Sequence, residues 1–415
     1  MATTKSRTAA KRSSASRSVR VIKKKQGVTK KQASIMIAAV ALIGGFFVYK
    51  SFAATHDYVY MGVENANGSG TVQRSSSDGA SKLTYGLEWP QRLFDGDLLS
   101  RDKTRILATY GGKTNLYNSA TGALVGQAPK SVADLITDSV IRNGRVASFM
   151  PGDKTVLVNS PDYKFKVANL STGVITTFPV PSGYRSFEQQ NISRDGKKVV
   201  YVACSAADNQ EVVISANIDG SGAKVVRKAS TSGGDLGHPQ WSNDGKKISY
   251  YESNETSSQN NITVKLKVIN ADGSGDKLLS NVVSNHTAVG SGDRDYDDVR
   301  QYTETSGPAT WHDQWSTGSS SIIFKKVAAG HIENLFTIDI NTGKVSPVTS
   351  NTSPNTVIGY YGVTAGNRIV YSYGSAGTAG SVYDKQTSVV SVKFDGTARR
   401  MLYTGTTPIT SLLWW

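Results

Sequence analysis

The residues best suited to chemistry include five histidines, which lie far apart along the chain. They are His56, His238, His286, His312 and His331. His238 and His312 each precede a tryptophan by three residues, which predicts that they occupy equivalent positions in two copies of a repeat. Two imidazoles from neighbouring repeats would be suitable ligands for a divalent metal ion. Because no two histidines are two or four residues apart, local hydrogen bonding is the favoured interpretation.

A run of carboxylates forms the second candidate site. Asp293, Asp295 and Asp297 alternate, and Glu304 is twelfth counting from Asp293. Carboxylates at positions 1, 3, 5 and 12 have the spacing of a calcium-binding loop. However, Asp298 stands where that loop needs glycine, and no flanking helices are expected. A solvated acidic loop is therefore favoured, calcium is the alternative, and no other cofactor is expected.

The motifs of common enzyme classes are missing from the sequence. There is no Gly-x-Ser-x-Gly elbow for a serine nucleophile and no glycine-rich phosphate loop that opens a helix. The single cysteine, Cys204, alternates as a strand residue and is expected to be buried. No catalytic residues are assigned. The candidate binding residues are Trp311 and His312, beside a long insertion, together with His238.

The elements that must position these residues are strands, in a unit that recurs along the chain. Residues 192–201 read ISRDGKKVVY and residues 241–250 read WSNDGKKISY. Each predicts a strand, a tight turn and a second strand. Weaker copies with the same nine-residue offset are 99–108, 149–158, 315–324 and 362–371.

A second hairpin unit follows each copy of the first. Examples are residues 212–222 and 266–275, which end in Asp-Gly-Ser-Gly. Others are 115–122, 166–173, 335–343 and 389–396. Two hairpins make a four-stranded antiparallel sheet of about 45 residues, the size of a propeller blade. The sequence is therefore assigned to the all-β class.

The number of units predicts how the ring closes. The first unit occurs six times and the second seven times, because residues 58–70 carry one without a preceding partner. An apolar strand at residues 409–415 would pair with that N-terminal unit and remove both sheet edges. A seven-bladed β-propeller is favoured, with a split blade that combines 56–86 with 408–415, and six blades are the alternative. The longest interval between repeats contains an insertion at 281–310.

These turns resemble a known repeat. Pro239, Trp241 and Ser242 followed by Asp-Gly-Lys-Lys, with the Asn-Ala-Asp-Gly-Ser-Gly turn of residues 270–275, look like the TolB-type propeller repeat. The resemblance is sharp over 190–280 and looser over the rest of 56–415. It implies a propeller that is commonly exported. In bacteria such propellers are often used for binding proteins or as the non-catalytic part of peptidases.

The N-terminal segment determines the expected location. The 415-residue chain has a net charge of +15, and 11 basic residues fall in 1–31, ahead of the first acidic residue, Asp57. Residues 1–32 are expected to be a disordered cytoplasmic tail. Residues 33–54 would form a transmembrane signal anchor, since 22 residues of helix span roughly 33 Å. Residues 55–415 would then be an extracytoplasmic propeller. The alternative is secretion after signal-peptide cleavage near Ala53.

The sequence therefore favours a membrane-tethered extracytoplasmic propeller that binds a protein or a cell-envelope glycan. The alternative is a metal-assisted polysaccharide lyase or hydrolase that uses the propeller funnel. The basic tail is expected to attract anionic lipid head groups. Nucleic acid is not an expected partner, because the tail has no aromatic platform on which bases could stack.

Overall fold

The computed structural model describes most of the second of two units, Thr55–Trp415, into which the chain divides. The described residues are 57–64, 70–89, 98–110, 112–143, 147–230, 235–253, 262–286, 314–328, 332–353, 356–375, 386–406 and 409–414. The predicted tail (1–32) and membrane segment (33–54) lie outside them. No helix among these residues is long and apolar enough to cross a membrane.

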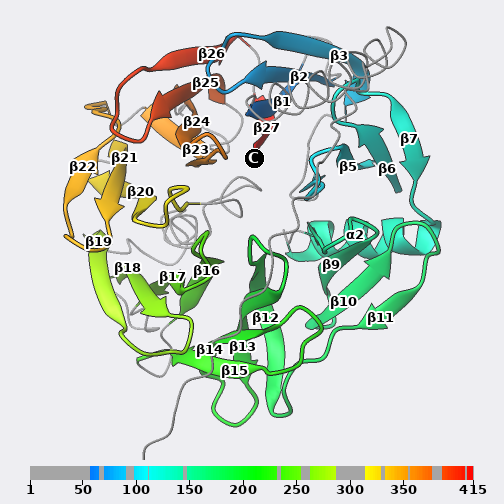
Figure 1. Ribbon diagram of the computed structural model, residues 1–415, viewed down its shortest axis with the longest axis vertical. Coiled ribbons are helices and arrows are strands. Elements are labelled where there is room, and N and C mark those ends of the chain that lie inside the picture. Colours follow the sequence, from blue (N-terminus) through cyan, green and yellow to red (C-terminus); the bar gives the residue numbers. More distant parts are fainter. Residues whose placement is uncertain are drawn as a thin grey trace, which may run out of the picture. The chain divides into compact units, whose positions relative to one another are not determined.

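The described strands form seven antiparallel sheets arranged around an axis, as in a seven-bladed propeller (Figure 1). Within each blade the strands follow one another from the innermost outwards. Blade 1 contains β27 (Ile409–Trp414), β1 (Tyr58–Glu64), β2 (Gly70–Ser76) and β3 (Lys82–Trp89). Blade 2 contains β4 (Leu98–Leu99), β5 (Arg105–Tyr110), β6 (Lys113–Asn118) and β7 (Leu124–Gln127). Blade 3 contains β8 (Ala147–Phe149), β9 (Thr155–Ser160), β10 (Lys164–Asn169) and β11 (Ile175–Thr177).

The remaining four blades follow in chain order. Blade 4 contains β12 (Tyr184–Ile192), β13 (Lys198–Ser205), β14 (Glu211–Asn217) and β15 (Lys224–Lys228). Blade 5 contains β16 (Leu236–Trp241), β17 (Lys247–Ser253), β18 (Ile262–Asn270) and β19 (Lys277–His286). Blade 6 contains β20 (Ser321–Ala328), β21 (Ile332–Asp339) and β22 (Val345–Pro347), extended inwards by a bridge between Trp315 and Ile322. Blade 7 contains β23 (Thr356–Val363), β24 (Arg368–Ser375), β25 (Gln386–Lys393) and β26 (Arg400–Thr404).

The split blade confirms the predicted closure of the ring. β27 pairs antiparallel with β1, with Met61 opposite Leu412 and Val59 opposite Trp414. The prediction that residues 58–70 are a copy of the second hairpin unit, which joins the third and fourth strands of a blade, is wrong, because β1 and β2 are the second and third strands of their blade. The outer hairpin is instead β2–β3, which turns at Asp78 and Gly79. One C-terminal strand therefore joins three N-terminal strands and completes blade 1.

The repeated Ser-x-Asp-Gly sequence builds the first turn of a blade. The Ser193 hydroxyl donates to Asp195 Oδ1 at 2.7 Å and accepts the Lys198 N–H at 2.9 Å. Ser242 makes the same two bonds with Asp244 and Lys247, at 2.6 and 2.9 Å. A serine hydroxyl thus satisfies the backbone N–H of the second strand, which is why the repeat keeps serine and aspartate two residues apart.

The turns between the third and fourth strands need glycine because residues of the preceding blade pack against them. Gly220 has φ +83°, and a Cβ there would lie 2.3 Å from Pro179 Cγ in the chain that follows blade 3. Gly122 has φ +72°, and a Cβ would lie 2.5 Å from Tyr85 Cδ1 of blade 1. Both conformation and space therefore restrict these positions to glycine.

The core lies between adjacent blades, where large side chains recur at one repeat position. Tyr201, Tyr250 and Phe324 occupy this position, and all three are fully buried. Trp241 and Trp315 are also buried, and Cys204 is buried as expected. Each interface is thus a patch of aromatic and β-branched residues contributed by two blades.

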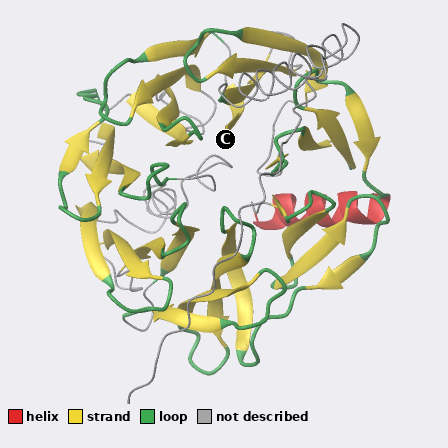
Figure 2. Ribbon diagram, in the orientation of Figure 1, coloured by secondary structure: helices red, strands yellow, loops and turns green. Residues whose placement is uncertain are grey.

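One helix departs from the expected all-strand pattern. α2 (Lys130–Asn143) connects β7 to β8 and stands out as the only helix among the described residues (Figure 2). Val132 and Ile136 are buried in the cluster that also contains Leu107 and Val156 of blades 2 and 3. The helix therefore fills part of the interface between these two short-stranded blades.

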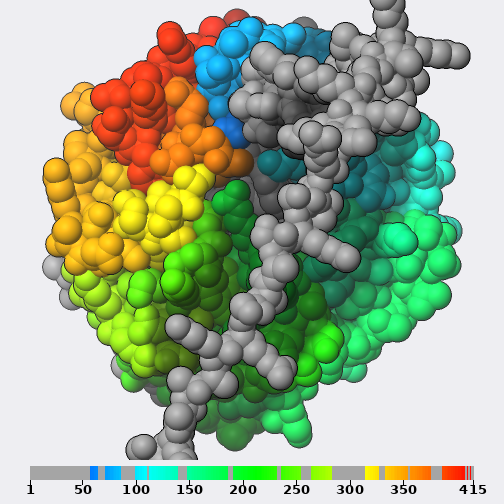
Figure 3. All heavy atoms as spheres, in the orientation of Figure 1, coloured from blue at the N-terminus to red at the C-terminus, as the bar shows by residue number. Residues whose placement is uncertain are grey.

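The two faces of the ring differ in their connections. The turn between the first and second strand of blades 2 to 7 is four or five residues long, and these six turns define what we call the turn face. Because the strands are antiparallel, the connections between second and third strands lie at the opposite end, which we call the loop face. The connection 287–313 enters blade 6 from the loop face. Figure 3 shows the described residues of the blades packed against their neighbours in one view of the ring.

Candidate functional site

His238 lies on the innermost strand of blade 5, in an irregular stretch of β16. The register between β16 and β17 shifts between Gly237 and Gln240, and His238 has φ +48°. Such a conformation is uncommon for a residue with a side chain and is found at sites where the surrounding structure enforces it. The imidazole is 4% exposed, and its ring meets the Tyr251 ring edge-on at 6.1 Å.

Buried polar side chains connect His238 to the next two blades. We call His238, Gln240, Tyr251, Gln314 and Tyr361 the inner network. The Gln314 backbone N–H donates to Gln240 Oε1 at 3.1 Å, and the Tyr251 hydroxyl donates to Gln314 Oε1 at 3.5 Å. Tyr251 also hydrogen-bonds Tyr361 of blade 7. The network therefore joins the inner strands of blades 5, 6 and 7.

The inner network is electrically neutral at physiological pH. Burial lowers the pKa of the His238 imidazole to about 3. Burial also raises the pKa of Tyr251 to about 12, against the opposing effect of its hydrogen bonds to Gln314 and Tyr361. Burial raises the pKa of Tyr361 well above its ordinary value. These groups donate and accept hydrogen bonds, but none has a pKa suited to acid–base catalysis near pH 7.

Two buried carboxylates, Glu333 and Glu211, connect neighbouring blades. Glu333 accepts the Ile358 backbone N–H at 2.6 Å and pairs with Lys325 Nζ at 3.0 Å. Glu211 accepts the Leu236 backbone N–H at 2.6 Å in the same arrangement. In both cases the N–H lies 25 residues further on, at the inner strand of the next blade. These carboxylates therefore fasten one blade to the next.

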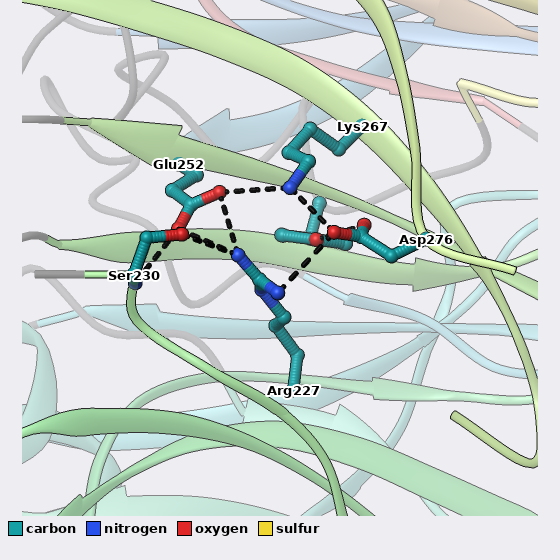
Figure 4. Close-up of polar contacts among 6 residues, drawn as sticks. Arg227, Ser230, Glu252, Lys267 and Asp276 are labelled. Atoms are coloured by element: carbon teal, nitrogen blue, oxygen red, sulfur yellow. Dashed lines mark hydrogen bonds and ion pairs between the residues drawn. The ribbon is translucent and has the colours of Figure 1, made fainter. Parts of the chain in front are cut away.

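A second polar cluster joins blades 4 and 5 (Figure 4). Arg227 contacts Glu252 at 3.0 Å and Asp276 at 3.2 Å, and Lys267 contacts the same two carboxylates at 3.0 and 2.6 Å. The Ser230 backbone N–H donates to Glu252 at 2.9 Å. Two cations thus face two carboxylates. Since their charges balance, we interpret this ionic cluster as a fastener between blades.

The pKa of Glu252 reflects the strength of the ionic cluster. Burial by itself raises the pKa of a carboxyl group, but the hydrogen bonds from Ser230, Lys267 and Arg227 outweigh it and lower the pKa of Glu252 to about 2. The residue is 6% exposed. It is therefore ionised throughout the physiological range.

The structure describes only part of the predicted site. Among the described residues, no group of three histidine, cysteine or acidic side chains is placed to hold a metal ion. His238 lies on an inner strand, next to the residue 314 segment that follows His312. Two predicted binding residues, Trp311 and His312, lie outside the described residues. The predicted calcium ligands also lie outside them; these ligands are Asp293, Asp295, Asp297 and Glu304.

Sequence reasoning missed most of the inner network and the whole ionic cluster. Gln240 and Gln314 each stand one residue before a repeat tryptophan, Trp241 and Trp315. That shared position was a usable signal that both side chains lie on inner strands. The ionic cluster has no comparable signal, because its members come from four separate parts of two blades.

No protein-family model and no curated protein matches this chain. Solved structures do. An oligogalacturonate lyase in complex with manganese aligns with a TM-score of 0.51 at 12% identity, over 84% of this chain and 85% of that chain. At this identity the likeness shows the propeller fold and leaves function open.

The similar solved structures include TolB proteins, the family whose repeat the turns resemble. TolB from Acinetobacter baumannii aligns over 86% of this chain and 66% of that chain, at 13% identity and a TM-score of 0.42. An oligogalacturonate lyase from Vibrio parahaemolyticus aligns over 85% and 87% of the two chains, at 11% identity and a TM-score of 0.48.

Proposed function

We propose that this chain is a membrane-tethered, extracytoplasmic propeller that binds a protein or glycan of the cell envelope at its loop face. Residues 33–54 provide the anchor in this proposal, and residues 55–415 provide the binding domain. The basic tail at 1–32 stays in the cytoplasm and attracts anionic lipid.

The observation that carries the proposal is the asymmetry of the connections. Every first turn on the turn face is four or five residues long, whereas the connection 287–313 joins blade 6 from the loop face. Long connections on a rigid scaffold are where binding residues concentrate. Gln314, the first described residue after this connection, is buried in the inner network.

The chemistry of the inner network supports binding over catalysis. His238 is neutral, both tyrosines remain protonated, and Glu333 is paired with Lys325. The described inner strands thus present hydrogen-bonding groups without an acid–base pair. Because its side chains are buried, the role we assign to the neutral inner network is that of a rigid support for the loop face.

The second candidate is a metal-assisted polysaccharide lyase or hydrolase. The likeness to a manganese-bound oligogalacturonate lyase raises this candidate, and the neutral imidazole of His238 has the protonation state of a metal ligand. Within the described part of the chain, His238 belongs to no group of three histidine, cysteine or acidic side chains placed to hold a metal ion. Any further ligand would come from His312 or from the acidic run at 293–304.

The test is capture of partners from the native membranes. Full-length chain is compared with a variant in which residues 287–310 are replaced by a short Gly-Ser linker. A matched control variant replaces Gln127, which is exposed on the outer strand β7, by leucine. Thermal unfolding of each protein establishes that the ring is intact.

We expect the wild type and Gln127→Leu to capture the same envelope partner and the shortened variant to lose it. Retention of that partner by a shortened and folded variant would refute binding through the loop face. Formation of unsaturated sugar from acidic oligosaccharide with manganese present, lost in His238→Ala, would establish the lyase instead.

A further inference from the structure

We propose that the loop face of blades 3 and 4 holds a sugar-binding platform, in which the Tyr163 ring stacks on a sugar and Arg185 hydrogen-bonds the oxygen atoms of that sugar. The platform rests on the proposed function and makes the partner bound at the loop face a glycan. Three features support it: the backbone and exposure of Tyr163, the position of Arg185, and the polar surroundings of the pair.

Tyr163 is the last residue of the turn between β9 and β10 of blade 3, which lies on the loop face. Its backbone N–H donates to the Ser160 carbonyl at 3.1 Å. The Ser160 hydroxyl contacts the Asp162 carboxylate and lies 2.7 Å from the Lys164 carbonyl oxygen. Tyr163 therefore projects from a turn whose shape is fixed by its own hydrogen bonds.

The backbone of Tyr163 has a conformation that tyrosine seldom adopts. Its φ is +57°, in the left-handed region. The corresponding turns of blades 2 and 4 have this conformation at Gly112 (φ +72°) and Asn209 (φ +55°), which are residue types that tolerate it. Stability alone would favour glycine or asparagine at position 163 as well.

Tyr163 is also unusually open to solvent. It is 45% exposed, and it is the only aromatic residue among the exposed large hydrophobic residues that the structure describes. Arginines lie over tyrosine rings elsewhere too, but those rings are buried or half-buried; they belong to Tyr58, Tyr85, Tyr371 and Tyr373. A residue that is unfavourable in both conformation and exposure indicates that its ring serves binding.

Arg185 places a guanidinium beside this ring. It is exposed near the beginning of β12, the inner strand of blade 4, and β12 begins at the loop face. Its Cζ lies 5.9 Å from the centre of the Tyr163 ring, and its Nη2 donates to Asn209 Oδ1 at 3.4 Å. Two blades that are neighbours in the ring (Figure 1) thus contribute the aromatic ring and the hydrogen-bond donor.

The surroundings of the pair favour a glycan over a protein. Apart from Tyr163, the exposed residues of these two turns and of the strand positions beside them are small or polar; they are Asp162, Lys164, Ala206, Ala207, Asp208 and Asn209. The centre of a protein interface is wider, more apolar and depleted of charge. One aromatic ring among polar groups is suited to a sugar, which has apolar C–H faces and a rim of hydroxyl groups.

The charges around the platform are balanced. The exposed charged residues that the structure describes on α2 and on the loop face of blades 3 and 4 are Lys130, Lys164, Arg185 and Lys228, with Asp134, Asp138, Asp162 and Asp208. Asp208 pairs with Lys228 at 2.8 Å, and Asp134 pairs with Lys130 at 2.7 Å. Such a surface does not attract anionic polymers in general, so binding depends on stacking and hydrogen bonds and should persist in salt.

The test measures binding of the full-length chain to polysaccharide extracted from the native cell envelope and freed of protein by protease. The polysaccharide is immobilised for biolayer interferometry, and dextran provides the control surface. Tyr163→Gly removes the ring and relieves the backbone, whereas Tyr163→Phe keeps the ring. The matched control Lys103→Gly relieves a comparable conformation (φ +63°) on the turn face and removes a positive charge.

A pair of arginine variants tests the hydrogen-bond donor. Arg185→Gln removes the guanidinium beside Tyr163. The matched control is Arg399→Gln, which removes an exposed guanidinium that lies 5.8 Å from the Tyr373 ring centre in blade 7. The two variants have the same net charge, so only the position of the lost arginine distinguishes them.

We expect Tyr163→Gly to weaken binding about tenfold, the effect of losing an aromatic stack. Its unfolding midpoint should not fall, because glycine adopts the backbone conformation at position 163 readily. Arg185→Gln should weaken binding severalfold. Tyr163→Phe and the two controls should bind as the wild type does, with little change between about 0.15 M and 1 M salt.

Four results would overturn the proposal. These are absence of binding by the wild type, binding by Tyr163→Gly or Arg185→Gln that equals the wild type, a fall in the unfolding midpoint of Tyr163→Gly, and loss of wild-type binding in 1 M salt.

Capture from native membranes separates this proposal from the function on which it rests. Capture of a protein by the wild type and by Tyr163→Gly, but not by the chain shortened at 287–310, would support binding at the loop face and refute the sugar platform. Loss of the captured partner in Tyr163→Gly, together with binding of the wild type to the polysaccharide, would support both. Capture of nothing, with no binding to the polysaccharide, would refute both.

Discussion

Replacement of Glu252 by glutamine is the sharpest test of how the blades are held together. Glu252 accepts hydrogen bonds from Arg227, Lys267 and Ser230 at the interface of blades 4 and 5. Glutamine keeps the shape of the side chain but removes its charge. The variant leaves Arg227 and Lys267 with Asp276 as their remaining carboxylate in the cluster.

The expected loss of stability is worked from the carboxylate. The pKa of Glu252 lies near 2 instead of its ordinary 4.5, a difference that corresponds to about 3 kcal/mol of folding free energy. Removal of one partner from a buried ion pair typically costs about 3–5 kcal/mol, which agrees with this value. Because the folded-state pKa is lowered, the stabilisation is complete above about pH 5 and is lost as the pH falls towards 2.

The assay is denaturant unfolding of the full-length chain between pH 7 and pH 2. Asp208→Asn is the matched control. Its hydrogen bond with Lys228 lowers the pKa of Asp208 to about 2 as well, but that pair is exposed to solvent. We expect a small change for the control and about 3 kcal/mol at pH 7 for Glu252→Gln, fading as the pH falls. Equal losses in the two variants would refute the reasoning.

Three further predictions follow from the fold. Deletion of β27, residues 409–414, should abolish cooperative thermal unfolding, because blade 1 would lose its inner strand; an unchanged circular-dichroism melt would contradict the closure. Glu333→Gln should destabilise the chain by about 3 kcal/mol in denaturant unfolding, since Lys325 keeps a buried charge without its partner; a loss below about 1 kcal/mol would contradict a fastening role. The His238 imidazole should show no NMR titration between pH 5 and 8. Its pKa is lowered by folding, so its contribution to stability is lost as the pH falls from about 7 towards 3, and His238→Gln should weaken that dependence.

The propeller was predictable because its signals are local. Ser193, Asp195 and Gly196 build one turn from neighbouring residues, so the turn can be read from six consecutive letters. Closure was predictable because an apolar strand at the C-terminus needed a partner. The position of residues 58–70 within blade 1 was mistaken, because a hairpin between the second and third strands has the same pattern as one between the third and fourth.

The helix and the inner network could not be predicted, because they depend on contacts between residues that are distant in the sequence. α2 was missed because its buried face, Val132 and Ile136, is short and lies among polar residues. The inner network joins residues that are far apart in the sequence, 63 positions for Tyr251 and Gln314 and 74 for Gln240 and Gln314. Glutamine and tyrosine are common on surfaces, and only the assembled ring shows that these are buried.

Photocrosslinking from both faces of the ring in native membranes tests the central claim most directly. A photoreactive amino acid is placed at Ala207 on the loop face or at Gly318 on the turn face of the full-length chain. The account predicts a discrete protein or glycan adduct from Ala207 and none from Gly318. A discrete macromolecular adduct from Gly318 and none from Ala207 would contradict it.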